Sequence, residues 1–306
     1  MNLKYDKLGL KLALATAFMS GFSVFINKYG VSIADPSVYT TAKNMVAAAL
    51  LAGVLLVGRD YSKVGRVTRW QWAGLLAVGL VGGCVPFILY FKGLALTSAA
   101  HAAFIHKTMF VFVAVGAVFL LGERLTFGVV FAGVLLLLGS AFLAGFSPSG
   151  VEFGDVLVAA ATLFWAAENL LSRRLLSSVP SGVLACARMV FGSVFLLVYL
   201  ALTGQLGGLL SLSAAAWEWS FVTGVLLFLY VGCWYVSLSR LPAGVATAIL
   251  LLGAPITALL SFLFAGSSLT FTQAAGLVLV PAGLLFWVFE AEFRTTLGRA
   301  PSGVKS

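Results

Sequence analysis

Apolar runs of about 20 residues follow one another along the whole chain, and they constrain its fold more than any motif does. As a helix, such a run spans the hydrocarbon core of a bilayer, which is about 30 Å thick. The sequence of 306 residues is 61% hydrophobic and only 9% charged, which excludes an ordinary soluble domain. We therefore predict an all-α membrane protein with ten transmembrane helices, at about residues 8–27, 36–58, 70–91, 99–121, 127–146, 154–171, 181–203, 217–239, 243–265 and 271–291.

The second half of the chain repeats the first at an offset of about 144 residues. The stretch 93–146 overlays the stretch 237–290 without a gap, so that Leu94 matches Leu238 and Gly122 matches Gly266. Five helices per half is an odd number, so the second half must enter the membrane from the opposite side. We expect two inverted five-helix repeats, residues 1–147 and 148–306, around a central cavity, with the C-terminal tail in the cytoplasm.

Lysine and arginine gather on one side of this predicted topology. With the N-terminus in the cytoplasm, 14 of the 19 lie on the cytoplasmic side and two on the other. Because cytoplasmic loops carry an excess of these residues, we predict that both termini are cytoplasmic. The first apolar run is long enough to span, and we interpret it as a retained helix rather than a signal peptide. The net charge of +9 thus reflects topology, and no nucleic-acid partner is expected.

Four charged residues lie inside predicted helices, namely Lys43, Lys107, Glu168 and Arg188. A charge at the centre of a membrane helix costs about 2.5–3.5 kcal/mol, so these positions favour a functional site. Lys107 lies too deep to reach the interface easily, which indicates a water-filled cavity. Lys43, which shares a helical face with Tyr39, and Arg188 are closer to helix ends, so snorkelling explains them equally well.

Matching polar stripes mark the helices at 8–27 and 154–171. The first stripe contains Ser20, Ser23 and Asn27, and a shift of 145 residues brings these positions to Trp165, Glu168 and Ser172, with Asn169 beside them. Hydrogen bonding between helices accounts for the serines without any ligand. For Glu168 and Trp165 a position in a cavity is the favoured interpretation.

Aromatic residues within the helices at 70–91 and 217–239 suit the wall of an apolar cavity, although packing explains any one of them. We expect that cavity between the helices at 8–27, 70–91, 99–121, 154–171, 217–239 and 243–265, with those at 127–146 and 271–291 outside it. The candidate substrate-binding residues are Ser20, Ser23, Tyr39, Lys43, Tyr90, His101, Lys107, Trp165, Glu168, Asn169, Arg188, Tyr230 and Trp234.

An enzyme is disfavoured. His101 and His106 are five residues apart and point about 140° away from each other on a helix, and the sequence has only these two histidines. The three cysteines all lie inside apolar runs, so neither a metal centre nor a disulfide framework is expected. No nucleotide-binding loop is present, and we expect no cofactor.

Three local segments resemble the EamA-type branch of the drug/metabolite transporter superfamily: Gly122-Glu123-Arg124-Leu125, Leu96-Thr97-Ser98-Ala99-Ala100, and Pro255. The resemblance covers about residues 8–291 and is closest to bacterial amino-acid exporters of the YddG type. The second half departs from the pattern, with Gly266-Ser267-Ser268 in place of Gly-Glu-Arg. The resemblance implies a secondary transporter of the bacterial inner membrane that exports aromatic and other neutral amino acids by alternating access.

The charges of the predicted wall leave several substrates open. Lys43, Lys107 and Arg188 against Glu168 suit a carboxylate beside an ammonium group, and the aromatic residues suit an apolar side chain. A phosphorylated metabolite fits the positive excess as well, whereas hydrophobic cationic drugs do not. A membrane scaffold that transports nothing is a further alternative, and both proton coupling and uniport remain possible mechanisms.

Overall fold

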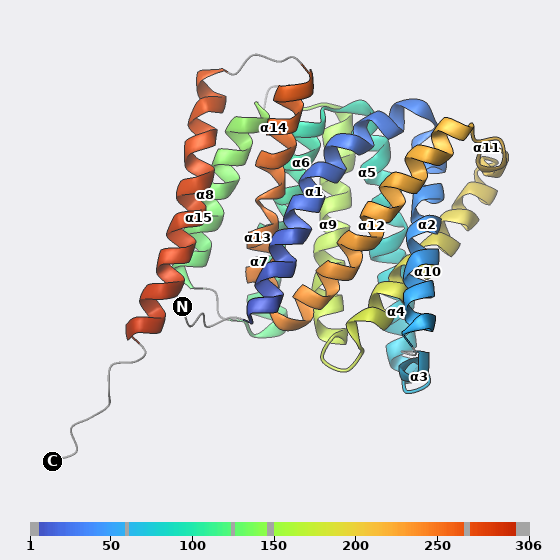
Figure 1. The fold of residues 1–306 in the computed structure, drawn as a ribbon, viewed down its shortest axis with the longest axis horizontal. Coiled ribbons are helices and arrows are strands. Elements are labelled where there is room, and N and C mark those ends of the chain that lie inside the picture. The colour runs from blue at the N-terminus through green and yellow to red at the C-terminus, as the bar shows by residue number, and fades with distance from the viewer. Residues whose placement is uncertain (1–5, 59–60, 124–125, 146–149, 266–269, 298–306) are drawn as a thin grey trace.

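The computed structural model of the chain describes residues 6–58, 61–123, 126–145, 150–265 and 270–297, and every regular element in these ranges is a helix (Figure 1). Part of the sequence repeat, at Arg124-Leu125 and at 266–269, lies outside them. The helices are α1 (Lys7–Ile33), α2 (Pro36–Val57), α3 (Tyr61–Val64), α4 (Arg69–Gly83), α5 (Val85–Leu96), α6 (Ala99–Lys107), α7 (Met109–Leu121), α8 (Phe127–Ala144), α9 (Phe153–Leu175), α10 (Ser181–Leu202), α11 (Leu206–Leu210), α12 (Ala214–Arg240), α13 (Ala243–Leu250), α14 (Gly253–Ala265) and α15 (Phe271–Leu297).

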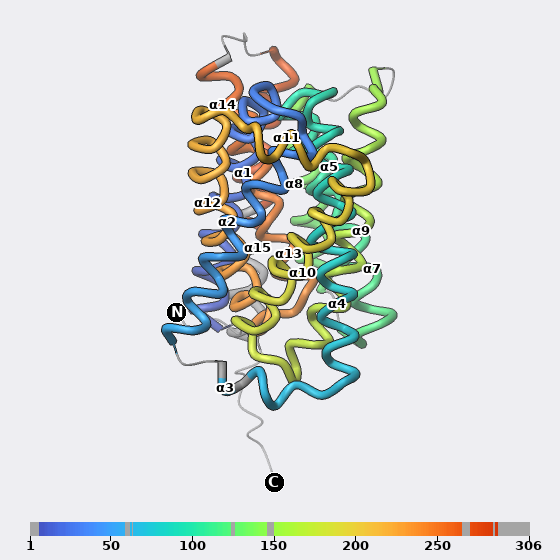
Figure 2. Tube along the Cα trace, turned by 90° about the vertical axis from the view of Figure 1, so that its right-hand side faces the viewer, coloured from blue at the N-terminus to red at the C-terminus, as the bar shows by residue number. Residues whose placement is uncertain are grey.

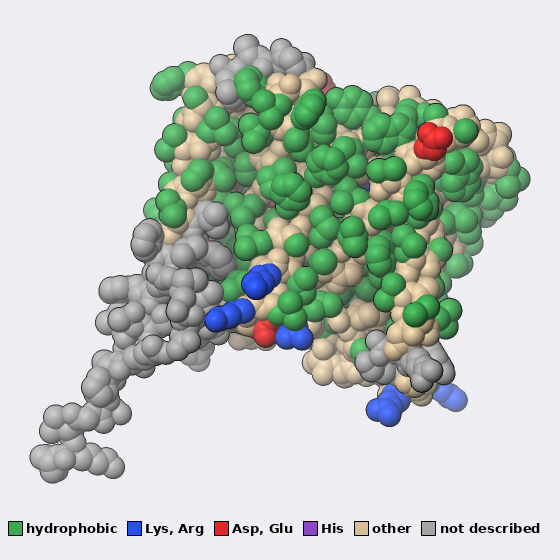
Figure 3. All heavy atoms as spheres, in the orientation of Figure 1, with side chains coloured by type: hydrophobic (Ala, Val, Ile, Leu, Met, Phe, Trp, Pro, Cys, Tyr) green, Lys and Arg blue, Asp and Glu red, His purple; other side chains and the backbone are tan. Residues whose placement is uncertain are grey.

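Within the described residues, nine helical segments are long and apolar enough to cross a membrane. They correspond to the first nine predicted spans. The tenth falls on α15, whose described apolar part, Phe271–Gly283, is shorter, so that span stays a prediction. Figure 3 shows hydrophobic side chains over most of one face of the bundle, with lysine and arginine near the end at which α1 begins. Exposed apolar side chains such as Phe119 and Phe271 suit contact with lipid.

Helix starts follow from capping side chains in the sequence. The Asp6 carboxylate accepts a hydrogen bond from the Gly9 backbone N–H at 2.7 Å, and this bond lowers the pKa of Asp6 below its usual value. Thr68 forms a capping box with Gln71 at the start of α4, and Ser213 caps α12 through the Ala216 N–H. These residues place the helix starts at the ends of the apolar runs.

Three of the spans predicted as continuous helices each consist of two helices joined at a break. The breaks lie at Cys84 between α4 and α5, at Thr108 between α6 and α7, and at Leu251-Leu252 between α13 and α14. Pro86 follows the first break and Pro255 the third, and a proline lacks the N–H that an unbroken helix needs. The Thr108 hydroxyl donates to the Ile105 carbonyl at 2.6 Å, which competes with the helical hydrogen bonds at the second break.

Two helix pairs on opposite sides of the bundle centre position the site. Helix α1 packs along α12, and α5 packs along α9, while α8 and α15 form a separate pair at one edge of the molecule (Figures 1 and 2). Close approach at that edge needs glycine, because a Cβ on Gly276 would lie 2.6 Å from the Gly139 carbonyl oxygen. The α8–α15 pair therefore lies at the edge of the bundle, where α8 also contacts α6 and α14.

Candidate functional site

A cavity of about 80 Å³ lies between the α1–α12 and α5–α9 pairs, with further walls from α2, α6, α7 and α10. Ten of the thirteen candidate residues line it: Ser20, Ser23, Lys43, Tyr90, Trp165, Glu168, Asn169, Arg188, Tyr230 and Trp234. Among the described residues of α8 and α15, none lines the cavity. The expectation for the span at 243–265 is wrong for this cavity, since α13 and α14 contribute none, whereas α2 and α10 supply Lys43 and Arg188.

Glu168 supplies the acid of the cavity. Its side chain is 1% exposed, and its Oε1 accepts hydrogen bonds from the Tyr235 hydroxyl at 2.5 Å and from the Ser172 hydroxyl. A buried carboxylate needs such donors, because removal from water penalises the charge. Gly82 of α4 makes room for it, since a Cβ there would lie 2.3 Å from Glu168 Cγ and 3.1 Å from Arg188 Nε. Glycine at this position thus leaves room for both the Glu168 and the Arg188 side chains.

Arg188 brings a cation to the same region, and in the described part of the chain no ion pair joins it to a carboxylate. Its Nη2 donates to the Gly82 carbonyl at 3.0 Å, an oxygen that also accepts from the Trp165 indole N–H at 3.0 Å. Its guanidinium carbon lies 5.7 Å from the centre of the Phe87 ring. Among the described residues, Arg188 Nε is buried without a hydrogen-bond partner. A guanidinium with an unused N–H facing a cavity is suited to bind an anionic group.

Lys43 brings a second cation, held by an amide and an aromatic ring. Its Nζ donates to Asn27 Oδ1 at 3.1 Å and lies 4.0 Å from the centre of the Phe91 ring. The Tyr39 hydroxyl donates to the same Asn27 oxygen at 2.9 Å and hydrogen-bonds Thr223 at 2.8 Å. Tyr39 is therefore a candidate residue that supports Asn27 from behind the wall and does not line the cavity.

Lys107 is fully buried next to the cavity but does not line it. Its Nζ donates to the Ser20 hydroxyl at 2.6 Å, and Ser20 lies between the amine and the cavity. A Cβ on Gly253 would lie 2.9 Å from Lys107 Cε, so the lysine sits between the break that separates α6 from α7 and the start of α14. The Lys107 amine is thus connected to the cavity through Ser20, and its predicted water-filled environment stays a prediction.

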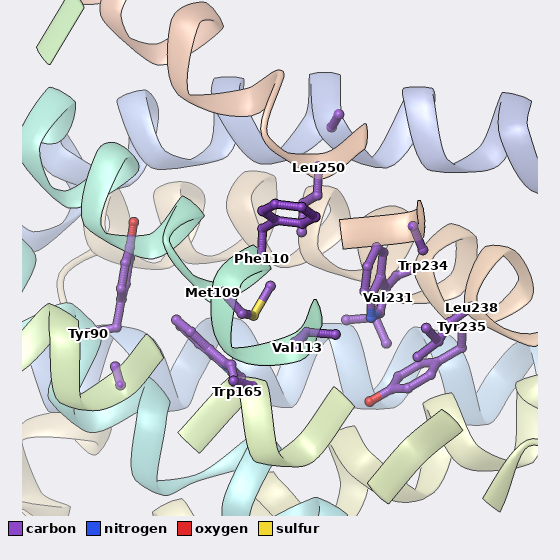
Figure 4. Close-up of a cluster of buried hydrophobic side chains, with 14 of the residues drawn as sticks. Tyr90, Met109, Phe110, Val113, Trp165, Val231, Trp234, Tyr235, Leu238 and Leu250 are labelled. Carbon is purple, nitrogen blue, oxygen red and sulfur yellow. The ribbon is translucent and has the colours of Figure 1, made fainter. Parts of the chain in front are cut away.

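Aromatic rings form the apolar part of the wall. The Trp165 ring centre lies 5.2 Å from that of Tyr90 and 4.8 Å from that of His106, and the Trp234 indole N–H donates to Asn169 Oδ1 at 2.9 Å. Figure 4 shows Tyr90, Met109, Trp165 and Trp234 gathered in this region from α5, α7, α9 and α12. In the described part of the chain, the Tyr90 hydroxyl and His106 Nδ1 are buried without a partner. Both residues line the cavity.

His101 does not line the cavity. It lies in the first turn of α6, where its Nδ1 is 3.7 Å from Asp155 Oδ2, whereas His106 takes the cavity position. His101 and His106 are five residues apart, so their rings lie on different faces of the helix. This explains why only His106 reaches the site.

The other lining residues that the candidate list omits are Val24, Asn27, Phe87, Phe91, Met109 and Leu227. Asn27 belongs to the predicted polar stripe, and Phe87 and Phe91 flank Tyr90 on α5. Their position within a turn of predicted residues is the signal that identifies them. In the described ranges, no group of three or more His, Cys, Asp and Glu residues is arranged to hold a metal ion.

The chain matches the EamA-like transporter family twice, over residues 7–145 and over residues 152–289. It belongs to the EamA-like transporter family. The family resemblance read from the sequence is thereby confirmed, and the chain is a multi-pass membrane transporter. The matches cover most of the elements that surround the cavity, so this cavity is the candidate transport site of an EamA-like protein.

Relatives of this EamA-like chain include two uncharacterized transporters of Archaeoglobus fulgidus. One is 28% identical over 204 residues, which cover 65% of this chain and 68% of the relative. The other is 27% identical over 279 residues, covering 89% and 95%. A solved crystal structure of a protein superposes with a TM-score of 0.70 at 18% identity, over 92% of this chain and 97% of that one. That likeness concerns the fold.

Proposed function

We propose that this EamA-like transporter exports amino acids, including aromatic and other neutral ones, by alternating access through the cavity between the α1–α12 and α5–α9 pairs. The observation that carries the proposal is the presence of Glu168, an Arg188 N–H without a partner, and an aromatic wall around one small space. An α-amino acid presents a carboxylate, an ammonium group and a side chain within a few ångströms of each other. Each of these groups has a counterpart in the wall.

Charge complementarity assigns the ends of the substrate. The carboxylate faces Arg188 and Lys43, which supply N–H donors that are otherwise shared with only one carbonyl and one amide oxygen. The ammonium group faces Glu168. The side chain lies against Tyr90, Trp165 and Trp234, which offer apolar area and weak cation–π attraction. Low dielectric strengthens both charge contacts relative to water.

The size of the cavity argues against large ligands. Pockets that enclose drug-sized ligands have volumes of about 300–1,000 Å³, and this cavity has about 80 Å³. The ten residues shared with the predicted site all line this one cavity. Export of bulky hydrophobic drugs is the less favoured reading on both size and charge.

We further propose that residues 1–147 and 148–306 form two inverted repeats, with both termini in the cytoplasm of a bacterial cell and the helices in its inner membrane. The helix packing supports this proposal. In the repeat, α9 is the counterpart of α1, and α12 is the counterpart of the span that contains α5. Accordingly, α1 packs on α12 and α9 packs on α5, while α8 packs on its own counterpart α15. Inverted repeats place a substrate site between the halves, near the midplane of the membrane.

A phosphorylated or otherwise anionic metabolite is the second candidate substrate. Three buried cations, Lys43, Lys107 and Arg188, stand near the cavity against one acid, Glu168, and this excess suits a dianion. The position of Glu168 in the wall argues for the amino acid, because an acid repels a phosphate group but attracts an ammonium group.

Purified protein in liposomes tests the proposal through uptake of labelled phenylalanine, methionine and threonine, with and without a pH gradient. We expect saturable uptake of all three, and a rate that follows the pH gradient identifies proton coupling. Uptake of a labelled sugar phosphate without any amino-acid uptake would establish the second candidate, and a protein that moves neither would favour the scaffold.

A further inference from the structure

Lys28, on the last turns of α1, closes the C-terminal end of α5. Its Nζ donates to the backbone carbonyls of Leu94 at 2.7 Å, Ala95 at 3.2 Å and Thr97 at 2.6 Å. These belong to the carbonyl groups that a helix leaves without partners at its C-terminus, where the helix dipole also attracts a cation. We call this contact the Lys28 clamp. A second link at the same end joins the Thr97 hydroxyl to Asp155 Oδ1 at 2.6 Å.

Arg173, on the last turn of α9, makes an equivalent contact with the C-terminal end of α12. Its Nη1 donates to the carbonyls of Leu238 at 3.1 Å and Ser239 at 3.4 Å, and we call this contact the Arg173 clamp. Glu123 reinforces it, because its carboxylate lies 3.6 Å from Arg173 Nε and accepts from the Ala243 N–H at 2.9 Å. The Arg173–Glu123 pair thus provides a cation for the carbonyls at the end of α12 and an anion for the N–H groups at the start of α13.

The two clamps occupy matching positions in the sequence repeat and opposite ends of the bundle. Arg173 follows Lys28 by 145 residues, and Leu238 and Ser239 follow Leu94 and Ala95 by 144. Helix α1 ends near the upper end of the bundle as drawn, and α9 ends near the lower end (Figure 1). Each clamp ties one of the two helix pairs to the other: Lys28 ties α1 to α5, and Arg173 ties α9 to α12.

We infer that the Lys28 and Arg173 clamps are the two gates of the transport cycle, and that opening either end of the cavity requires its own clamp to break. The α1–α12 and α5–α9 pairs move as units, because each is extensively packed along its length. With the Lys28 clamp broken and the Arg173 clamp intact, the pairs separate at the end where α1 ends. With the reverse arrangement they separate at the end where α9 ends. This inference rests on the proposed alternating access.

Each clamp is connected to the cavity through the residue that precedes it. Asn27, beside Lys28, holds the Lys43 amine and donates to Ser23 Oγ at 2.9 Å. Ser172, beside Arg173, donates to Glu168. A ligand that binds Lys43 or Glu168 therefore acts on the same helix turn that carries a clamp. A ligand shifts the equilibrium between the two open states only if it binds one of them more tightly than the other, and contacts next to a clamp can produce that difference.

The clamps are suited to open reversibly, because they lie at helix ends and not in the middle of spans. A lysine or arginine released at the end of a membrane helix reaches water or lipid headgroups with its long side chain. The carbonyls that it leaves are likewise hydrated near the membrane surface. Breaking a clamp thus costs a few charge-assisted hydrogen bonds but leaves no charge stranded in hydrocarbon.

Labelling of one cysteine in the cavity tests the inference without any substrate. In a chain whose Cys84, Cys186 and Cys233 are replaced by alanine, Leu227→Cys places a thiol in the cavity wall. Membrane-impermeant thiol reagents are then added to vesicles from either side. Lys28→Met should raise the labelling rate from the side where α1 ends relative to the other side, by roughly 5- to 30-fold, which corresponds to the loss of one or two net charge-assisted bonds. Arg173→Met should shift the ratio in the opposite direction.

Two control substitutions separate the effect of losing a charge from the effect of losing a clamp. Each removes a lysine near the same end of the bundle as one clamp. Lys92 lies toward the end of α5 and donates to the Tyr199 hydroxyl at 2.8 Å, and Lys11 is exposed near the start of α1. Lys92→Met and Lys11→Met should leave the labelling ratio unchanged. Lys28→Arg and Arg173→Lys should restore the original ratio, since both keep a cation that reaches the carbonyls.

Opposite shifts from the two clamp variants support the gates. Equal shifts, no shift, or the same shifts from the Lys92 and Lys11 controls would overturn the inference. If a methionine variant does not fold, glutamine at the same position removes the charge and no longer reaches the carbonyls, so an unchanged ratio there would equally overturn the inference. Because labelling needs no substrate, opposite shifts in a protein without amino-acid flux would reject the proposed substrate and leave the gates standing.

Discussion

Glu168 combines a buried charge with a position in the cavity wall, and these two properties have opposite consequences for a substitution. A buried carboxylate stabilises a fold little, because desolvation offsets the bonds that it makes. We expect Glu168→Gln to keep the unfolding temperature within a few degrees of the original and to lower amino-acid flux at least about tenfold, the effect of about 1.4 kcal/mol. Flux per folded molecule, measured with thermal unfolding of the same samples, separates the two effects.

Glu218→Gln is the matched control, because Glu218 lies on the exposed part of α12. It should change neither quantity. Equal loss of folded protein and of flux in Glu168→Gln would assign Glu168 a structural role and contradict its place in the transport site.

Gly82 tests the crowding around Glu168 and Arg188. A Cβ there would lie 2.3 Å from Glu168 Cγ and 2.9 Å from Glu168 Cδ, so Gly82→Ala must displace the acid from its hydroxyl partners. Overpacking of this kind costs about 1–3 kcal/mol. We expect a lower unfolding temperature together with reduced flux per folded molecule. Gly53→Ala on α2, where a Cβ meets nothing within 4 Å, should leave both unchanged or raise stability slightly.

Sequence reasoning identified the buried charges more readily than their surroundings. Lys43, Glu168 and Arg188 stand out because charges are rare in apolar helices. Lys107 stands out for the same reason, and Tyr39 stands out because it shares a helical face with Lys43. Each nevertheless contacts the back of a wall residue, Ser20 or Asn27, instead of the cavity. Helical periodicity alone does not distinguish these positions, because the angle at which neighbouring helices cross decides which part of a polar face reaches a cavity.

At the scale of the helix, the α8–α15 pair is separate from the transport site. A Cβ on Gly276 would meet the Gly139 carbonyl oxygen at 2.6 Å, and a backbone atom cannot move aside as a side chain does. Gly276→Ala should therefore lower the unfolding temperature, by the equivalent of about 1–3 kcal/mol, and leave flux per folded molecule unchanged. A selective loss of flux with normal stability would show that this pair takes part in transport.

The helix breaks show where sequence reasoning at this scale ends. Pro86 and Pro255 indicate a kink in their spans, and both lie beside a break. The break at Thr108 has no proline, and the hydroxyl that replaces the helical hydrogen bond there is common in unbroken helices. Tertiary packing, including the contact of Lys107 with Ser20 and Gly253, therefore decides that this span divides into α6 and α7.

At the scale of the whole molecule, composition predicts the membrane spans because bilayer thickness imposes one length on every helix. Nine spans follow the predicted ranges closely. The pairing of α1 with α12 and of α5 with α9 is harder to predict from the sequence, since it joins residues that are far apart in the chain. The repeat offers the one sequence signal for it, because equivalent helices must make equivalent contacts. Lys28 and Arg173 are likewise equivalent positions of the repeat that make equivalent contacts.

Competition by two analogues of phenylalanine tests whether the cavity recognises both charges of an amino acid. Liposomes that contain the protein take up labelled phenylalanine in the presence of excess unlabelled phenylalanine, 3-phenylpropionate, which lacks the ammonium group, or phenethylamine, which lacks the carboxylate. We predict that only phenylalanine competes strongly, because each analogue leaves either Glu168 or Arg188 without its partner. Equally strong competition by 3-phenylpropionate would contradict the account and indicate a site for organic anions.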